Sequence, residues 1–157
     1  MESSHRRLMR HGMFLFLLGL LTGLAEQHFA NIRMGLAAHL EGVMNGIFLI
    51  ALGAAWPEVK LSPPPKAIAY WLVLYGAYAN WLVTSLAAAF GTGALSPITA
   101  AERSGQPWQE SFVKFAFFSV AIAIVTASVL VLCGLWGDGK NQARQTRNLP
   151  SKGTGQE

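Results

Sequence analysis

The chain alternates between long apolar stretches and short polar connections, and each apolar stretch has about the length of a membrane span. The stretches are residues 10–27, 35–56, 67–90 and 112–136. A helix needs about 20 apolar residues to cross the hydrocarbon core of a bilayer, because each residue adds about 1.5 Å. We therefore predict an all-α protein, an integral membrane four-helix bundle that forms one domain over residues 1–136.

The polar connections divide the predicted spans. The first stretch is the shortest, and its basic start and small-residue end also resemble a signal peptide. We expect it to remain as a span, because four spans make a compact bundle. Pro57 and the prolines at 63–65 predict a stiff turn between the second and third spans. Residues 91–111 predict a long loop, and residues 137–157 a disordered basic tail without apolar periodicity.

Charge patterning predicts the orientation of the spans. The sequence is 52% hydrophobic and only 13% charged, and its 12 Lys and Arg residues outnumber 8 Asp and Glu. Arg33, Arg103 and Lys114 lie on one side of the predicted membrane, and the other basic residues lie in the two tails and the 57–66 connection. The positive-inside rule places both termini in the cytoplasm. Aromatic residues do not interleave with the basic runs, which argues against a nucleic-acid partner.

Two residue types add smaller constraints. The single cysteine, Cys133, rules out a disulfide within the chain. Tryptophans stand near the ends of the predicted spans, where aromatic side chains anchor helices at the membrane interface. They are Trp56, Trp71, Trp108 and Trp136. The sequence has no zinc-ligand spacing, nucleophile elbow, phosphate loop or dinucleotide fingerprint, which argues against those enzyme classes.

The second predicted span carries His39, Glu41 and Asn45 within seven residues. Ionisable groups at membrane depth are costly, and they usually face a bundle interior, a cavity or a cofactor. On a helix, Glu41 and Asn45 lie one turn apart and share a face. His39 lies roughly 160° away from Glu41 around the helix. The span therefore predicts two functional faces.

His39 has Gly42 and Gly46 on its side of the span. Bare glycines at these positions allow the close approach of another helix, or of a flat ligand such as a porphyrin. Three interpretations of His39 remain open at this point. It is a structural residue bonded to a backbone carbonyl, a proton relay with Glu41, or an axial ligand of heme.

The third predicted span combines aromatic residues with an amide. Tyr78 aligns with Tyr75 and Trp81 at a spacing of three residues, and Asn80 lies beside them in the sequence. Aromatic faces and a polar handle together suit an aryl substrate. The alternative for both Asn45 and Asn80 is a structural hydrogen bond between helices.

Three segments carry a resemblance to a known family. They read RLMRHG at 7–12, GLAAHLEG followed by Asn45 and Gly46 at 35–46, and YGAYANW at 75–81. Together they make residues 6–136 similar to the hydroxylaminobenzene mutases, small membrane enzymes of bacterial nitroarene degradation. More remotely, His11-Gly12 and the pattern from Ala38-His39 to Asn45-Gly46 resemble the styrene oxide isomerases.

The resemblance implies a function and a cofactor. Hydroxylaminobenzene mutases convert N-arylhydroxylamines to 2-aminophenols, and the likeness implies a multi-pass protein of the bacterial inner membrane. The likeness to styrene oxide isomerases implies ferric heme b bound by His39 at an interface of a homotrimer, with Asn45 in the substrate site. After Asn80 the chain departs from these isomerases, because residues 82–85 (Leu-Val-Thr-Ser) replace an active-site tyrosine.

These residues give a working hypothesis for catalysis. Asn45 orients a hydroxylamine substrate from the bilayer, Asn80 and Tyr78 assist, and Glu41 moves a proton. His39, beside Gly42 and Gly46, holds a ferric heme that acts as a Lewis acid. Two alternatives stay open, an epoxide isomerase of the styrene oxide isomerase type and a non-catalytic membrane heme subunit or transporter.

Overall fold

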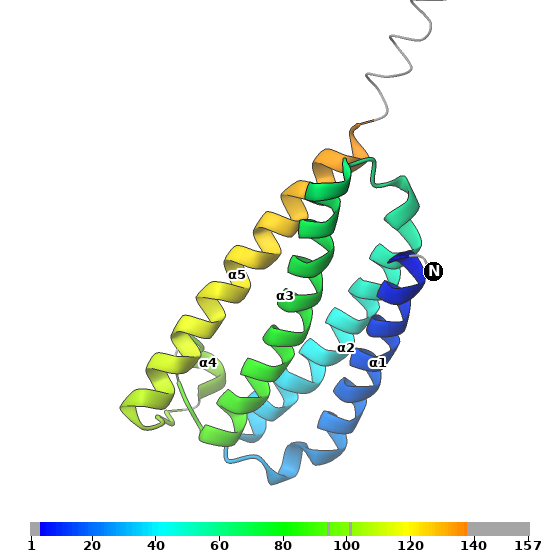
Figure 1. Ribbon diagram of the computed structural model, residues 1–157. Coiled ribbons are helices and arrows are strands. Elements are labelled where there is room, and N and C mark those ends of the chain that lie inside the picture. The colour runs from blue at the N-terminus through cyan, green and yellow to red at the C-terminus, as the bar shows by residue number, and fades with distance from the viewer. Residues whose placement is uncertain (1–3, 94, 101, 138–157) are drawn as a thin grey trace, which may run out of the picture.

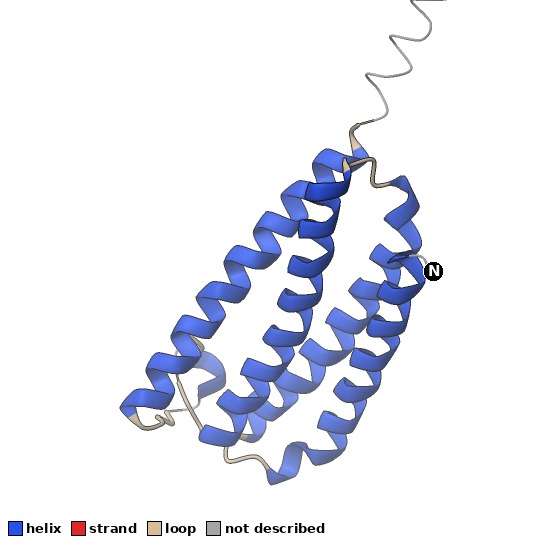
Figure 2. Cartoon of the chain, viewed as in Figure 1, coloured by secondary structure: helices blue, strands red, loops and turns tan. Residues whose placement is uncertain are grey.

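The computed structural model describes residues 4–93, 95–100 and 102–137, and this part of the chain is helical without a strand (Figure 2). Its long helices are α1 (Ser4–Ala25), α2 (Ile32–Ala55), α3 (Pro63–Phe90) and α5 (Pro107–Leu135). All four are long and apolar enough to cross a membrane. The prediction of an all-α membrane four-helix bundle is confirmed. The predicted disordered tail falls, apart from Gly137, outside the described residues.

Short helical elements connect the long helices. They are the 3-10 helices η1 (Glu26–His28) and η2 (Trp56–Glu58) and the short helix α4 (Pro97–Ala100). Figure 1 shows the long helices side by side in the order α1, α2, α3, α5, with α1 and α5 at the two edges. The backbone N–H of Lys60 donates to the carbonyl of Gly134 at 3.0 Å, which joins the α2–α3 connection to the end of α5. Both ends of the described chain therefore lie at one end of the bundle, and their cytoplasmic location stays a prediction.

The four long helices begin earlier than the apolar stretches, because polar residues and prolines form their first turns. The side chain of Asn31 accepts a hydrogen bond from the backbone N–H of Met34 at 3.2 Å and caps α2. The prolines at 63–65 were predicted to form a turn, but they form the first turn of α3. Proline is tolerated there because first-turn N–H groups have no partner within the helix. Pro107 likewise begins α5 inside the predicted long loop.

Glycines bring α1 and α2 into close contact. A Cβ atom on Gly19 would lie 2.5 Å from the backbone nitrogen of Val43. A Cβ atom on Gly46 would lie 2.6 Å from the backbone nitrogen of Phe16. Small residues at such crossings allow the backbones of two membrane helices to approach and pack directly.

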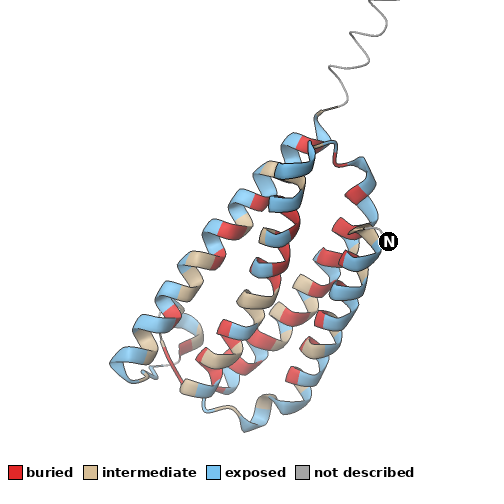
Figure 3. Cartoon of the chain, in the orientation of Figure 1, coloured by how far each residue is buried: buried red, intermediate tan, exposed pale blue. Residues whose placement is uncertain are grey.

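The apolar core lies between the four long helices and includes buried residues of α5. Figure 3 shows buried positions between the helices and exposed positions on their outer sides, and many of the exposed side chains are large and apolar. Exposed apolar faces are expected where helices contact lipid or another subunit. Trp71, Trp108 and Trp136 are exposed, as interfacial anchors are expected to be. The prediction for Trp56 was wrong, because its side chain is only 4% exposed and packs edge-to-face on Tyr70 at 6.0 Å.

Candidate active site

Three polar side chains predicted for the site meet between α2 and α3. The amide Nδ2 of Asn45 donates to the Oε2 atom of Glu41 at 3.2 Å, one turn away on α2. The Nδ2 atom of Asn80, on α3, donates to the same carboxylate oxygen. Asn45 also donates to the backbone carbonyl of Ala77 at 3.4 Å. The hydrogen bonds between helices that the structural interpretation of both asparagines predicted are therefore present.

These hydrogen bonds fix the orientation of both amides. A carboxylate only accepts hydrogen bonds, so the –NH₂ groups of Asn45 and Asn80 must face Glu41. The carbonyl oxygen of each amide is then directed away from Glu41. Neither Oδ1 atom receives a hydrogen bond from a described residue, and neither is buried without a partner. The cluster thus offers two free hydrogen-bond acceptors.

The two asparagines line a cleft of about 450 Å³ between α2, α3 and α5. The cleft is lined by Asn45, Phe48, Gly76, Asn80, Phe117, Val120, Ala121, Ile124 and Ser128. Apart from the two amides and one hydroxyl, this lining is apolar, which is typical of sites that bind small aromatic molecules. Glu41 is absent from the lining, so it lies behind the amides rather than in the cleft.

The α5 side of the cleft was not foreseen from the sequence. Its residues Phe117, Ala121, Ile124 and Ser128 recur at the spacing of one helical face. The one sequence feature that could have indicated this wall is the hydroxyl of Ser128, which interrupts an otherwise apolar face. Phe48 was also missed, although it stands three residues after Asn45 and therefore on the same side of α2.

Tyr78 does not join this cluster, contrary to prediction. Its hydroxyl donates to the backbone carbonyl of His11 at 3.1 Å and lies 3.2 Å from the Nδ1 atom of the same histidine. Tyr75 instead pairs with Ser119 at 2.6 Å, and the indole N–H of Trp81 donates to Thr22 at 3.0 Å. Tyr78 and Trp81 thus bond to different residues of α1, and Tyr75 bonds to α5, because each polar tip has its own partner. The aromatic rings in the cleft are phenylalanines.

His39 faces the opposite neighbour of α2. Its Nδ1 atom lies 2.8 Å from the backbone carbonyl of Gly19 on α1. A carbonyl only accepts hydrogen bonds, so Nδ1 carries the proton and Nε2 keeps a free lone pair. The half-buried ring lies so close to Gly23 that a Cβ atom there would be 2.6 Å from Nδ1. A proton relay between His39 and Glu41 does not fit this geometry, because their side chains turn toward different helices.

The glycines beside His39 serve helix packing. A Cβ atom on Gly42 would lie 2.5 Å from the Cα atom of Gly19, and Gly46 packs on Phe16 in the same way. The expectation that Gly42 and Gly46 form a surface for a flat ligand is therefore wrong, because α1 already covers them. Of the predicted cofactor-binding residues, His39 alone keeps an atom free for a ligand.

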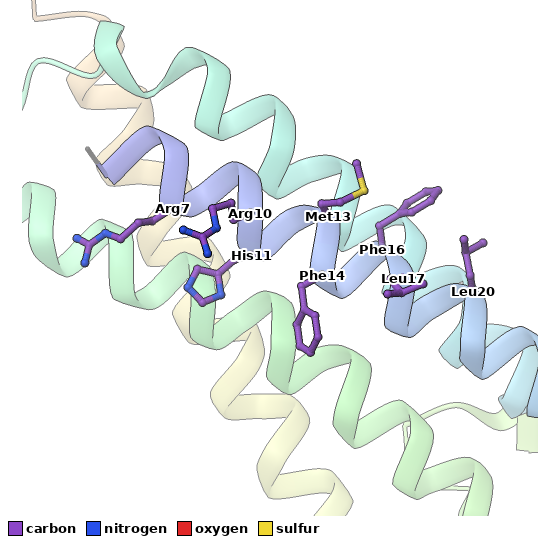
Figure 4. Close-up of a pocket in the computed structure, with 8 residues that line it drawn as sticks. All are labelled: Arg7, Arg10, His11, Met13, Phe14, Phe16, Leu17 and Leu20. Atoms are coloured by element: carbon purple, nitrogen blue, oxygen red, sulfur yellow. The ribbon is translucent and has the colours of Figure 1, made fainter. Parts of the chain in front are cut away.

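A larger hollow of about 850 Å³ runs along α1 but contains none of the three clustered polar residues. All eight residues that line it belong to this single helix, as Figure 4 shows. Arg7, Arg10 and His11 stand at one end, and the rest is apolar. Residues from one helix describe an exposed face rather than an enclosed site. We therefore place the candidate site at the smaller cleft. No group of three or more His, Cys, Asp or Glu side chains in the described chain is arranged to hold a metal ion.

Comparison with known proteins agrees with the resemblance seen in the sequence. The profile of a family described as styrene oxide isomerase matches residues 4–136. The chain is 44% identical over 151 residues to hydroxylaminobenzene mutase HabB of Ectopseudomonas oleovorans, covering 94% of this chain and 89% of that protein. It is 45% identical over 125 residues to hydroxylaminobenzene mutase HabA of the same organism, covering 79% of this chain and 93% of that protein. No solved structure matches the chain.

Proposed function

The chain belongs to the family of the styrene oxide isomerases and hydroxylaminobenzene mutases. On this premise, we propose that it is a membrane-bound isomerase that converts N-arylhydroxylamines to 2-aminophenols. The reaction balances within one molecule. The N–O bond breaks, the oxygen bonds to the ortho carbon of the ring, that carbon loses a proton and the nitrogen gains one. No net oxidation or reduction occurs, so no co-reactant is needed.

The observation that carries this proposal is the pair of free amide carbonyls in an apolar cleft. A hydroxylamine has an N–H and an O–H donor, and both need acceptors in a site without water. Asn45 and Asn80 lie on adjacent helices and line the same cleft, and each has an Oδ1 acceptor that no described donor uses. We assign them to the nitrogen and oxygen of the substrate, which fixes the direction of the aryl ring.

The rest of the cleft suits the ring and the charge that develops on it. Breaking the N–O bond leaves the ring and nitrogen electron-poor. The faces of Phe48 and Phe117 attract positive charge through their electron-rich π systems. The apolar lining also excludes water, which would otherwise compete for the reactive cation.

Glu41 acts here as a positioning residue. The earlier hypothesis gave it a proton-transfer role, but it lies behind the asparagines and is absent from the lining of the cleft. Its carboxylate accepts from both amides and so holds their carbonyl oxygens toward the substrate. Amides without this partner are free to turn their –NH₂ groups into the cleft, where they would not accept from the hydroxylamine.

Ferric heme b, held by His39, is the cofactor that we propose. Histidines that ligate a metal usually donate their other ring N–H to a carbonyl or carboxylate, which fixes the tautomer. His39 has this arrangement, with Nδ1 bonded to Gly19 and Nε2 free. One imidazole is sufficient as a protein ligand when a porphyrin supplies the other four. When bound, the ferric iron would supply a Lewis acid for the hydroxylamine oxygen.

A homotrimer is the assembly that we propose for this pair of sites. His39 and the cleft lie on different sides of α2, so one chain does not bring the two together. The arrangement is completed when His39 of one subunit faces the cleft of the next. The exposed apolar faces of the helices leave surface for such contacts.

The bacterial inner membrane is the proposed location, and breakdown of nitroarenes is the proposed context. Arylhydroxylamines form when nitroarenes are reduced, and they partition into a bilayer because of their ring. The cleft lies between membrane-crossing helices, so substrate reaches it from the lipid phase.

Epoxide isomerisation is the second candidate, because the matching profile is described as styrene oxide isomerase. The region that should supply a tyrosine has only two hydroxyl groups, those of Thr84 and Ser85. Thr84 donates to the backbone carbonyl of Asn80 at 2.8 Å, and Ser85 donates to that of Trp81 at 2.8 Å. Both hydroxyls are therefore used within α3, which favours the hydroxylamine as substrate.

Product analysis separates the two reactions. Purified protein in lipid nanodiscs is incubated with phenylhydroxylamine or with styrene oxide, and the products are separated by chromatography. We expect 2-aminophenol from the first and no phenylacetaldehyde from the second. Phenylacetaldehyde alone would support the epoxide isomerase, and the absence of both products would contradict an enzymatic role. The Asn45→Ala variant controls for background rearrangement of phenylhydroxylamine in buffer.

A further inference from the structure

A second, apolar hollow of about 250 Å³ adjoins the candidate cleft. The two hollows share Phe48, Ile124 and Ser128 in their linings. The rest of the second hollow is lined by apolar side chains from α2, α3 and the end of α5. The two hollows are therefore consecutive chambers of one groove. The first chamber contains the amides, and the second contains only apolar groups beside the shared Ser128.

Both helices that form the walls of the groove lead from the asparagines toward the second chamber. On α2 it passes from Asn45 in the first chamber to Leu52 in the second. These residues are seven positions apart, which is roughly 10 Å along a helix. On α3 it passes from Asn80 to Val73 in the same sense, because α2 and α3 are antiparallel neighbours (Figure 1). An elongated molecule with its polar end at the asparagines would extend toward the second chamber.

Ile124 stands where the two chambers meet. Its side chain lies on Gly76 of α3, so closely that a Cβ atom on Gly76 would be 2.5 Å from the Cγ1 atom of Ile124. The glycine thus lets a branched side chain of α5 pack directly against the backbone of α3, in the wall that both chambers share. Shortening this side chain would join the chambers without touching the asparagines.

We propose that Ile124 determines which arylhydroxylamines are accepted, by closing the first chamber behind a single aromatic ring. This inference rests on the proposed function. The hydroxylamine is held by the two asparagines, and the ring position opposite the nitrogen points toward Ile124. An alkyl group at that para position must displace Ile124 to reach the second chamber. The native protein therefore prefers unsubstituted or short substrates over para-butyl substrates.

The test compares phenylhydroxylamine with 4-butylphenylhydroxylamine as substrates. In the Ile124→Ala variant, we expect the ratio of kcat/KM for the butyl substrate over the unsubstituted one to rise at least tenfold. One extra or missing methylene group in an apolar pocket is typically worth about 10- to 200-fold. Ile124→Val should raise the same kcat/KM ratio by a smaller factor. This variant replaces Ile124→Ala in the test if the alanine variant does not fold. Ile122→Ala is the matched control, because Ile122 lies on the same helix but is 68% exposed.

A binding measurement keeps the inference separate from the proposed reaction. Aniline and 4-butylaniline do not rearrange, so the dissociation constant of each is measured by its direct binding to the protein in nanodiscs. Ile124→Ala should raise the preference for 4-butylaniline about tenfold, and Ile122→Ala should not. If this preference shifts while no variant turns over phenylhydroxylamine, the role of Ile124 stands and the proposed reaction falls. An unchanged preference, or an equal shift with Ile122→Ala, would overturn the role of Ile124.

Discussion

The side-chain amide of Asn80 on α3 donates a hydrogen bond to the carboxylate of Glu41 on α2, although 39 residues separate them in sequence. A carboxylate within a membrane-crossing helix needs such donors, because lipid offers none. Asn45 supplies the second donor from one turn further along α2. The same bonds that satisfy Glu41 also turn the –NH₂ group of each amide toward the carboxylate. Under the proposed function, structural stability and substrate recognition thus depend on one cluster.

Replacing Glu41 tests its positioning role. Glu41→Gln adds an –NH₂ group that competes with those of Asn45 and Asn80, so one amide is expected to turn. We expect kcat to fall by about tenfold, equivalent to about 1.4 kcal/mol of barrier, while the protein still folds. Glu41→Asp keeps a carboxylate and should retain more activity than Glu41→Gln. Steady-state kinetics with phenylhydroxylamine measure both, and equal activity of all three proteins would contradict the role.

Asn45→Ala should remove most turnover and leave the fold and heme content intact. The substitution removes one acceptor for the substrate but leaves Asn80 as a partner of Glu41. Loss of this acceptor leaves a donor of the bound substrate unpaired, which costs about 1–3 kcal/mol and should reduce kcat/KM by about 5- to 150-fold. Asn31→Ala, in a cap far from the cleft, is the control for general destabilisation. If Asn45→Ala instead fails to assemble, its role is structural.

The sequence was sufficient for the four spans and for the shared face of Glu41 and Asn45, because both follow from one-dimensional spacing. Helical periodicity alone places Glu41 and Asn45 on one face, but the hydrogen bond from Asn80 to Glu41 was not predicted, because it depends on how α3 packs against α2. The position of Tyr78 was not predictable in this way. Which neighbour a side chain meets depends on the rotation of α3 against α1, and the hydrogen bond to His11 decides it.

The glycines of α2 also show that the sequence alone does not identify which neighbour a helix face meets. Gly42 and Gly46 indicated a close approach on one side of α2, but the pattern did not distinguish a helix from a flat ligand. The matching glycines of α1, Gly12 and Gly19, settle the question in the structure. The α5 wall of the cleft was hidden for another reason. A helix that is apolar on nearly all sides gives no periodic signal of which face points inward.

His39→Asn provides a sharper test of heme ligation than alanine. An asparagine amide keeps a donor for the carbonyl of Gly19 but lacks an imidazole nitrogen for iron. We expect His39→Asn and His39→Ala to insert normally and to lose both the Soret absorption band and activity. His28→Ala is the matched control, because His28 is exposed in η1. Full heme occupancy in His39→Asn would exclude His39 as the ligand.

Gly42→Ala should weaken the packing of α1 on α2. Its Cβ atom would lie 2.5 Å from the Cα atom of Gly19, and backbone at this crossing has no room to yield. Overpacking of this kind typically costs about 1–3 kcal/mol. The free energy of unfolding is measured by denaturant titration in mixed micelles. Leu40→Ala, on the exposed side of the same helix, should change it much less, and equal effects would contradict the close crossing.

The last prediction joins the oxygen source to the assembly. His39 and the cleft lie on different sides of α2, so the proposed site combines His39 of one subunit with the asparagines of another. Native mass spectrometry should therefore show three protomers with about one heme each. A site enclosed in this way, with an apolar lining, should return the hydroxyl oxygen to the ring before it exchanges with water. Turnover in oxygen-18 water should leave the 2-aminophenol essentially unlabelled, and unlabelled water with labelled hydroxylamine is the reciprocal control. Heavy labelling would mean that water attacks a free cation, and a monomer that retains heme and activity would refute the shared site.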